Sequence, residues 1–205
     1  MFVDYLTLLL INMVAGLVVL AVVVLKGFDS DGCRPWAAAS AMVGFVAVAG
    51  GLHMSLTWPL PGSYNCAYGE MSVLFGVCFL GAALALAKGW ALTGVAVYAV
   101  FAGAAAVVVG AGIMKLGLTA QPGVAGVGFI LTGLGGMLIL PALWLRRVAA
   151  FRVLVAIILL AAAAIWALTG YVSYPKHLSA FANWHPPAQT AAGEGPWYEP
   201  IGPTP

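Results

Sequence analysis

Charged side chains are scarce in this sequence. Of its 205 residues only 7% are Asp, Glu, Lys or Arg, whereas 63% are hydrophobic. Soluble globular domains usually carry roughly 25% charged residues, so a chain of this composition cannot cover itself with polar groups in water. A lipid bilayer removes that requirement, because it contacts apolar side chains directly. The net charge of +2 is also too small to indicate nucleic acid as a partner.

Cysteines are also few, and the common catalytic motifs are missing. Cys33, Cys66 and Cys78 form no CxxC or similar metal-binding spacing, which leaves them as ordinary small apolar residues. The sequence contains no HExxH, no Walker A motif and no nucleophile elbow. No pair of intramembrane histidines marks a four-helix cytochrome b. These absences favour a protein that is not an enzyme on its own.

Long apolar runs are what the sequence does contain. A membrane-spanning helix needs about 20 predominantly apolar residues. Six segments meet or nearly meet that length, and Gly, Pro, Asn and Asp in the connections favour turns. The sequence therefore predicts an all-α fold, a polytopic membrane bundle of about six transmembrane helices. Their expected ranges are Tyr5–Leu25, Trp36–Trp58, Glu70–Ala87, Trp90–Met114, Val124–Leu145 and Phe151–Tyr174.

The distribution of Lys and Arg predicts the direction of these helices. Cytoplasmic connections carry an excess of basic residues. With both termini outside (N-out/C-out), six Lys or Arg fall in cytoplasmic connections, and only Lys115 and Lys176 lie outside. We therefore expect a multi-pass protein of the cell (cytoplasmic) membrane. Residues 1–175 would form the helix bundle, and residues 176–205 a Pro-rich extracytoplasmic tail.

Small residues at a spacing of four form a stripe on each of two predicted helices. Such stripes let helix backbones approach closely in lipid. They serve either packing within the bundle or docking of a neighbouring subunit, and the sequence leaves both open. The stripes are Ala102, Ala106 and Gly110 in one helix, and Gly128, Thr132 and Gly136 in the next.

A faint internal repeat involves the same region. Residues 51–54 (Gly-Leu-His-Met) lead to the Pro-Gly pair at 61–62, and residues 112–115 (Gly-Ile-Met-Lys) lead at the same distance to the pair at 122–123. The pattern indicates either a duplicated helical hairpin or a chance similarity between Gly-rich apolar segments.

The end of the chain has a different composition. Residues 185–205 contain six prolines, which exclude a helix and favour an extended backbone. The tail is either disordered or lies across a surface of this protein or of a partner. In the second case, its aromatic residues Trp184, Trp197 and Tyr198 would make the contacts.

All three histidines fall on the outer side under this topology. Imidazole ligates haem iron, copper or zinc, so His53, His177 and His185 are candidate ligands of haem b or copper. Glu70 begins the third predicted helix on the same side and, with His53, is a candidate metal ligand. The alternatives are that His53 hydrogen-bonds a neighbouring helix and that the Glu70 carboxylate stabilises the first turn of its own helix.

The residues Thr57-Trp-Pro-Leu-Pro-Gly-Ser-Tyr-Asn65 form a distinctive segment, followed by Tyr68-Gly-Glu70. A second segment runs from Leu116 to Gly126. On these two segments the chain resembles an uncharacterised family of bacterial and archaeal multi-helix membrane proteins, a domain of unknown function. The resemblance excludes the Pro-rich tail. It implies a helix bundle and supplies no reaction, cofactor or catalytic residue.

Three functions are compatible with the sequence. The leading hypothesis is a non-catalytic accessory subunit of a larger membrane complex, of a respiratory or oxidative kind, whose partners are the lipid bilayer and other membrane subunits. The second is an electron-transfer or oxidation subunit with a haem or metal site on the outer face. The third is a small-solute transporter, which the scarcity of polar groups inside the predicted helices disfavours.

Overall fold

The computed structural model describes residues 5–60 and 62–182, and these residues form helices joined by turns, with no strand among them. Within that part of the chain, six helices are long and apolar enough to cross a membrane, which confirms the predicted all-α multi-pass bundle. The elements are α1 (Tyr5–Leu25), α2 (Ser30–Cys33), η1 (Arg34–Trp36), α3 (Ala37–Thr57), η2 (Asn65–Glu70), α4 (Met71–Lys88), α5 (Thr93–Leu116), α6 (Pro122–Trp144) and α7 (Ala149–Phe181).

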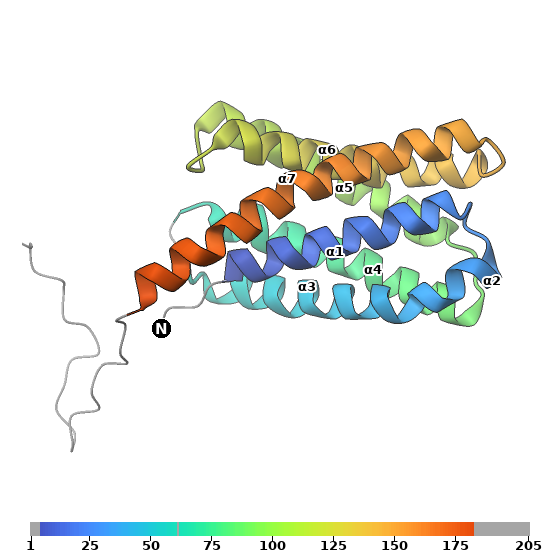
Figure 1. Ribbon diagram of the computed structural model, residues 1–205, viewed down its shortest axis with the longest axis horizontal. Helices are drawn as coiled ribbons and strands as arrows, with labels where there is room; N and C mark the ends of the chain where they lie inside the picture. Colours follow the sequence, from blue (N-terminus) through green and yellow to red (C-terminus); the bar gives the residue numbers. More distant parts are fainter. Residues whose placement is uncertain (1–4, 61, 183–205) are drawn as a thin grey trace, which may run out of the picture.

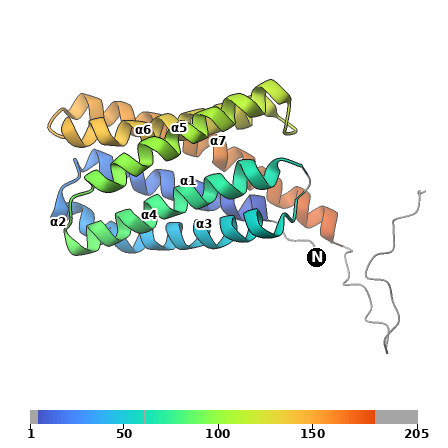
Figure 2. The same ribbon diagram turned by 180° about the vertical axis from the view of Figure 1, so that it is seen from behind.

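The six long helices form one closed bundle (Figures 1 and 2). Neighbours in the chain pack side by side, and α7 completes the bundle by packing against both α6 and α1. The contact between α4 and α5 is the least extensive of those between consecutive long helices. Asn12 of α1 adds a polar contact, because its side-chain amide donates a hydrogen bond to the carbonyl of Val43 on α3 at 2.9 Å.

The last helix runs further than the sequence predicted. The sequence predicted that this helix ends at Tyr174, and the next residue, Pro175, lacks a backbone N–H and would usually end or bend a helix. Instead, α7 continues through Pro175 to Phe181. The first turn of α1 lies beside this extension, and Thr7 Oγ1 is 3.2 Å from His177 Nδ1. The helix therefore crosses the boundary that the sequence placed at residue 175 and includes the first six residues of the expected tail.

Four glycines bring α3 and the η2–α4 segment together. A Cβ added to Gly44 would lie 2.8 Å from the carbonyl oxygen of Gly76, and one added to Gly51 would lie 2.7 Å from that of Gly69. Real Cβ atoms do not approach a backbone oxygen so closely. The two backbones can therefore be this close only because all four positions lack a side chain.

The α5–α6 hairpin uses the same arrangement. Gly103 faces Gly133 and Gly110 faces Gly126, again two glycines seven residues apart on each helix. The two hairpins thus share one arrangement of glycines. The glycine contacts align Gly51 with Gly110, whereas the sequence pattern had aligned it with Gly112.

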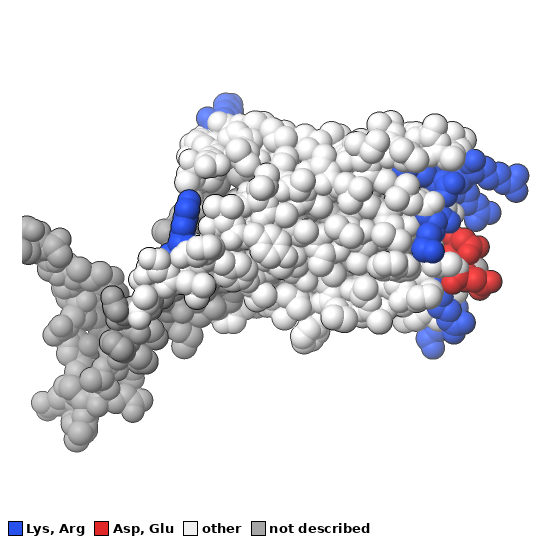
Figure 3. Space-filling view, in the orientation of Figure 1, with Lys and Arg blue, Asp and Glu red and all other residues white. Residues whose placement is uncertain are grey.

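Charge is concentrated at one end of the bundle (Figure 3). We call this the basic end, and it comprises the connections that follow α1, α4 and α6. The opposite end holds the α3–α4 and α5–α6 connections, with Lys115 and Lys176. The basic end carries Lys26, Arg34, Lys88, Arg146, Arg147 and Arg152, together with Asp29 and Asp31.

Candidate functional site

The distinctive segment at residues 57–65 forms the connection between α3 and η2. Trp58 ends α3 in the left-handed conformation (φ 49°), and its N–H donates to the Met54 carbonyl at 3.2 Å. Asn65 is fully buried and holds the loop: its Oδ1 accepts from the Leu60 N–H at 3.0 Å, and its Nδ2 donates to the Leu60 carbonyl. The two hydrogen bonds to the Leu60 backbone therefore explain why this segment contains Asn65.

Aromatic side chains connect this end of α4 to the other side of the bundle. Tyr64 stacks on Tyr68 at 6.0 Å between ring centroids, and Tyr68 meets Phe129 of α6 edge-on at 5.2 Å. Trp166 of α7 packs edge-on against Phe129 at 5.2 Å and is fully buried. Its Nε1–H donates to Thr132 Oγ1 at 2.9 Å. We call Tyr64, Tyr68, Phe129 and Trp166 the aromatic cluster.

The two described histidines belong to different helices and have different neighbours. His53 is exposed on α3, and Thr57 Oγ1 lies 3.1 Å from its Nδ1. His177 is on α7, beside Thr7 of α1. Glu70 is exposed at the end of η2. Among residues 5–60 and 62–182, no three His, Cys, Asp or Glu side chains are grouped as a metal ion would require.

Four residues that the sequence singled out lie outside the described residues. They are the candidate ligand His185 and the candidate contact residues Trp184, Trp197 and Tyr198.

The small-residue stripes make contacts within the chain. Ala106 and Gly110 are buried, and Gly110 faces Gly126 of α6. On α6, a Cβ added to Gly128 would lie 2.8 Å from the Trp166 ring, and Thr132 accepts the Trp166 hydrogen bond. Gly136 faces the backbone of α5. Packing within the bundle accounts for these contacts.

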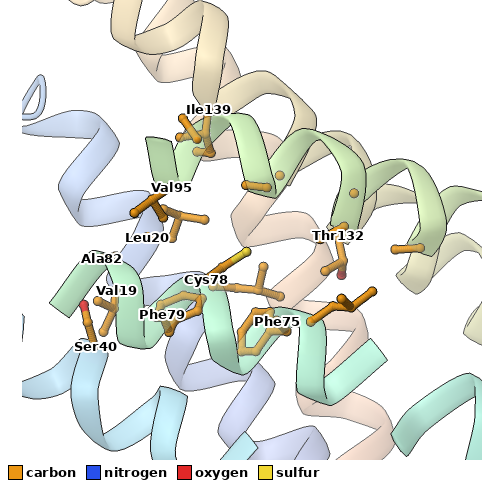
Figure 4. Close-up of a pocket in the computed structure, with 18 of the residues that line it drawn as sticks. Val19, Leu20, Ser40, Phe75, Cys78, Phe79, Ala82, Val95, Thr132 and Ile139 are labelled. Carbon is orange, nitrogen blue, oxygen red and sulfur yellow. The ribbon is translucent and has the colours of Figure 1, made fainter. Parts of the chain in front are cut away.

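An apolar cavity of about 120 Å³ lies inside the bundle (Figure 4). Side chains of α1, α4, α5 and α6 converge on it, and its walls include Ala102, Ala106, Thr132 and Gly136 from the two stripes. Ser40, Cys78 and Thr132 are the polar or thiol side chains among its lining residues. We call it the central cavity.

A second pocket, of about 430 Å³, lies at the basic end. It is lined by the connection between α4 and α5, by Trp90 and Trp144, and by two charged side chains, Asp29 and Arg146. We call it the end pocket. Phe28, Leu86 and Leu92 line both this pocket and the central cavity, so the two spaces are neighbours.

A family model described as a protein of unknown function (DUF981) matches residues 1–180. The chain belongs to this family. The membership expected from the two sequence segments is thereby confirmed. The family match takes in all six spanning helices and stops just before the end of α7. No curated protein and no solved structure matches the chain.

Three residues of this family member organise the structure but were not predicted from the sequence. Asn65 and Trp166 are described above. The third is Arg152, whose Nη1 donates to the Leu25 carbonyl at 2.6 Å and so caps the end of α1. The position of Trp166 was a usable signal, because tryptophans of membrane helices concentrate at the interfaces and this one lies deep within its helix. For Arg152 the sequence held no signal, since the contact joins distant parts of the chain.

Proposed function

We propose that this protein is a non-catalytic subunit of a larger membrane complex and that the outward face of α5 packs against another membrane protein. The observation that carries the proposal is the composition of that face. The face consists of Gly94, Tyr98, Phe101, Ala105, Val108 and Gly112.

These six residues lie on one side of α5. Gly94 and Gly112 are about five helical turns apart, and the other four occupy the same stripe between them. α5 is the least buried of the six spanning helices. Phe101 and Val108 are each 71% exposed, and nothing lies within 4 Å of a Cβ added to Gly94 or Gly112.

Lipid would cover an exposed Phe or Val as well as a protein would, so the glycines carry the argument. A glycine inside a helix costs roughly 1 kcal/mol relative to alanine. The glycines between α5 and α6 offset that cost through close packing, whereas Gly112, which lies beyond the first turn of α5, has no such contact within the chain. Close approach of a helix from another protein supplies one.

The bundle interior supports a non-catalytic role. Among the described residues, the buried polar side chains are Thr7, Ser40, Asn65 and Ser72, and none of these is ionisable. Proton relays, ion pathways and many transport sites depend on ionisable groups at membrane depth. A transporter therefore has less support than a non-catalytic subunit that acts through its outer surface.

The charge distribution supports an orientation for this subunit. Basic residues mark the cytoplasmic side of membrane proteins. We propose that the basic end faces the cytoplasm, which places both termini outside a cell membrane. The α3–α4 connection and His53 would then face outward.

Site-specific photo-crosslinking in native membranes tests the proposal. A photoreactive phenylalanine analogue replaces Phe101 in one variant and Phe45 of α3 in another. Phe45 is the matched control, because Phe101 and Phe45 are 71% and 69% exposed on different helices. We expect one discrete crosslinked protein of different sequence from the Phe101 position and none from the Phe45 position. Gly112→Phe should abolish the crosslink, and Gly123→Phe, which also enters open space, should leave it.

Two results would contradict the proposal. The first is equal crosslinking to lipid from both positions, with no protein product. The second is a product that contains only a second copy of this chain, because it would make the α5 face a homodimer interface.

A further inference from the structure

We propose that the bundle binds one anionic membrane phospholipid, with an acyl chain in the central cavity and the phosphate beside Arg146 in the end pocket. The proposal is independent of the α5 face. It rests on the proximity of two spaces of opposite character, which share Phe28, Leu86 and Leu92 among their lining residues.

The central cavity suits a hydrocarbon chain. Its lining is almost wholly apolar, and a water molecule needs two to four polar partners to remain in a buried site. Ser40, Cys78 and Thr132 are the few groups that could provide them, and Thr132 already donates to the Gly128 carbonyl at 2.8 Å. Apolar cavities of about 150 Å³ bind benzene-sized molecules, so about 120 Å³ accommodates part of an acyl chain.

The end pocket suits a phosphate. Arg146 lines it, and a guanidinium binds phosphate through two parallel N–H···O contacts. Trp90 and Trp144 line it as well, and both side chains are exposed at the end of the bundle. Exposed tryptophans at this depth are typical of the layer where lipid headgroups lie.

The surrounding charges favour an anion over a zwitterion. The carboxylate of Asp29 also lines the end pocket, but it accepts the Gly32 N–H at 2.8 Å within its own turn. The six basic side chains of the basic end outnumber Asp29 and Asp31. A headgroup with a net negative charge is therefore attracted here, whereas the positive choline of a zwitterionic lipid gains less.

Because the central cavity and the end pocket are neighbours, a lipid fits them better than a free ion does. A phosphate in the end pocket lies next to the central cavity, because Phe28, Leu86 and Leu92 line both spaces. A molecule that joins a phosphate to a hydrocarbon chain can occupy both at once. Inorganic phosphate alone would leave the central cavity unfilled.

Native mass spectrometry of the full chain, delipidated in detergent, tests binding. The probes are phosphatidylglycerol and phosphatidylcholine with identical oleoyl chains. We expect about fivefold greater retention of phosphatidylglycerol. Arg146→Gln should remove this preference, whereas Arg147→Gln, one residue away and outside the pocket lining, should preserve it. Equal retention of the two lipids, or equal effects of the two substitutions, would overturn the proposal.

Cavity filling tests the acyl chain. Ala82 lines the central cavity, so Ala82→Leu should lower the retention of phosphatidylglycerol about fivefold. Ala87→Leu, on the exposed side of the same helix, is the matched control and should have no effect. Unchanged retention in a folded Ala82→Leu variant would overturn the proposal.

Alkylation of Cys78 provides a readout that needs no substitution. Peptide-level mass spectrometry separates this thiol from Cys66, which is exposed and serves as an internal control. We expect phosphatidylglycerol to slow the reaction of Cys78 with N-ethylmaleimide and to leave that of Cys66 unchanged. Inorganic phosphate should protect neither thiol. Protection of Cys78 by phosphate alone, with no further effect of the lipid, would overturn the proposal in favour of a free-anion site.

Discussion

At the scale of single residues, a few polar side chains fix parts of the backbone that apolar packing cannot specify. Asn65 holds the α3–α4 connection, Thr132 joins α6 to Trp166 of α7, and Arg152 caps α1. The Trp166–Thr132 hydrogen bond lies between two spanning helices, where water is not available to replace it, whereas the Asn65 and Arg152 contacts lie at the ends of the bundle. Each of these contacts therefore makes a testable contribution to stability.

Replacing Asn65 should destabilise the protein by more than the loss of a small side chain would, because its amide bonds two backbone groups. Asn65→Ala leaves the N–H and carbonyl of Leu60 without their partners, and a buried unsatisfied group costs about 1–3 kcal/mol. Thermal unfolding in detergent should show a clear fall in the midpoint. Ser63→Ala, in the same loop, should have little effect, and a fall of equal size in that variant would contradict the explanation.

The Trp166–Thr132 hydrogen bond should appear as a coupling energy. In a double-mutant cycle of Trp166→Phe and Thr132→Val, we expect a coupling of about 0.6–1.7 kcal/mol, as for other hydrogen bonds between membrane helices. Chemical unfolding of the four proteins in detergent measures it. Strictly additive effects would show that the contact contributes no interaction energy beyond the packing of each side chain.

At the scale of elements, the two glycine-paired hairpins are the main organising feature. α3 with η2–α4, and α5 with α6, use glycines seven residues apart to bring two backbones together. In lipid there is no hydrophobic force to drive helices together, so close packing of small residues supplies much of the association energy. The spacing of the glycines also fixes the register of each hairpin.

Two glycines of α5 should respond oppositely to alanine. A Cβ at Gly110 would lie 2.7 Å from the Gly126 carbonyl oxygen, so Gly110→Ala must separate the helices, at a cost of about 1–3 kcal/mol. Gly112 has open space around it, so Gly112→Ala should be neutral or stabilising, because alanine is the better helix former. Unfolding midpoints in detergent compare them, and equal effects would rule out the backbone contact as the cause.

At the scale of the whole molecule, the bundle has one strongly charged end and a wall of apolar side chains. This distribution suits a protein held across a bilayer in one direction. It also places the end pocket at one boundary of the membrane and the α3–α4 connection at the other.

Cysteine accessibility in intact cells should reveal the direction. Cys66 lies at the end opposite the basic end and is exposed. With Cys33 and Cys78 replaced by Ala, a membrane-impermeant maleimide should label Cys66 without permeabilisation. In a chain without native cysteines, Arg147→Cys should be labelled only after permeabilisation. The reverse pattern would place the basic end outside.

Composition and apolar segment length alone predicted an all-α membrane protein with about six spanning helices, and the resemblance to an uncharacterised membrane-protein family also came from the sequence. Local sequence also predicted most helix ends, because caps and turns depend on neighbouring residues. The extension of α7 past Pro175 was not predicted, and it brings His177 beside Thr7 of α1, which is distant in the chain. Tertiary packing likewise decided which side of α5 faces inward: the side with Gly110 packs against α6, whereas the side with Gly112 faces open space. The central cavity exists only where helices from the whole chain meet, so no local pattern could have indicated it.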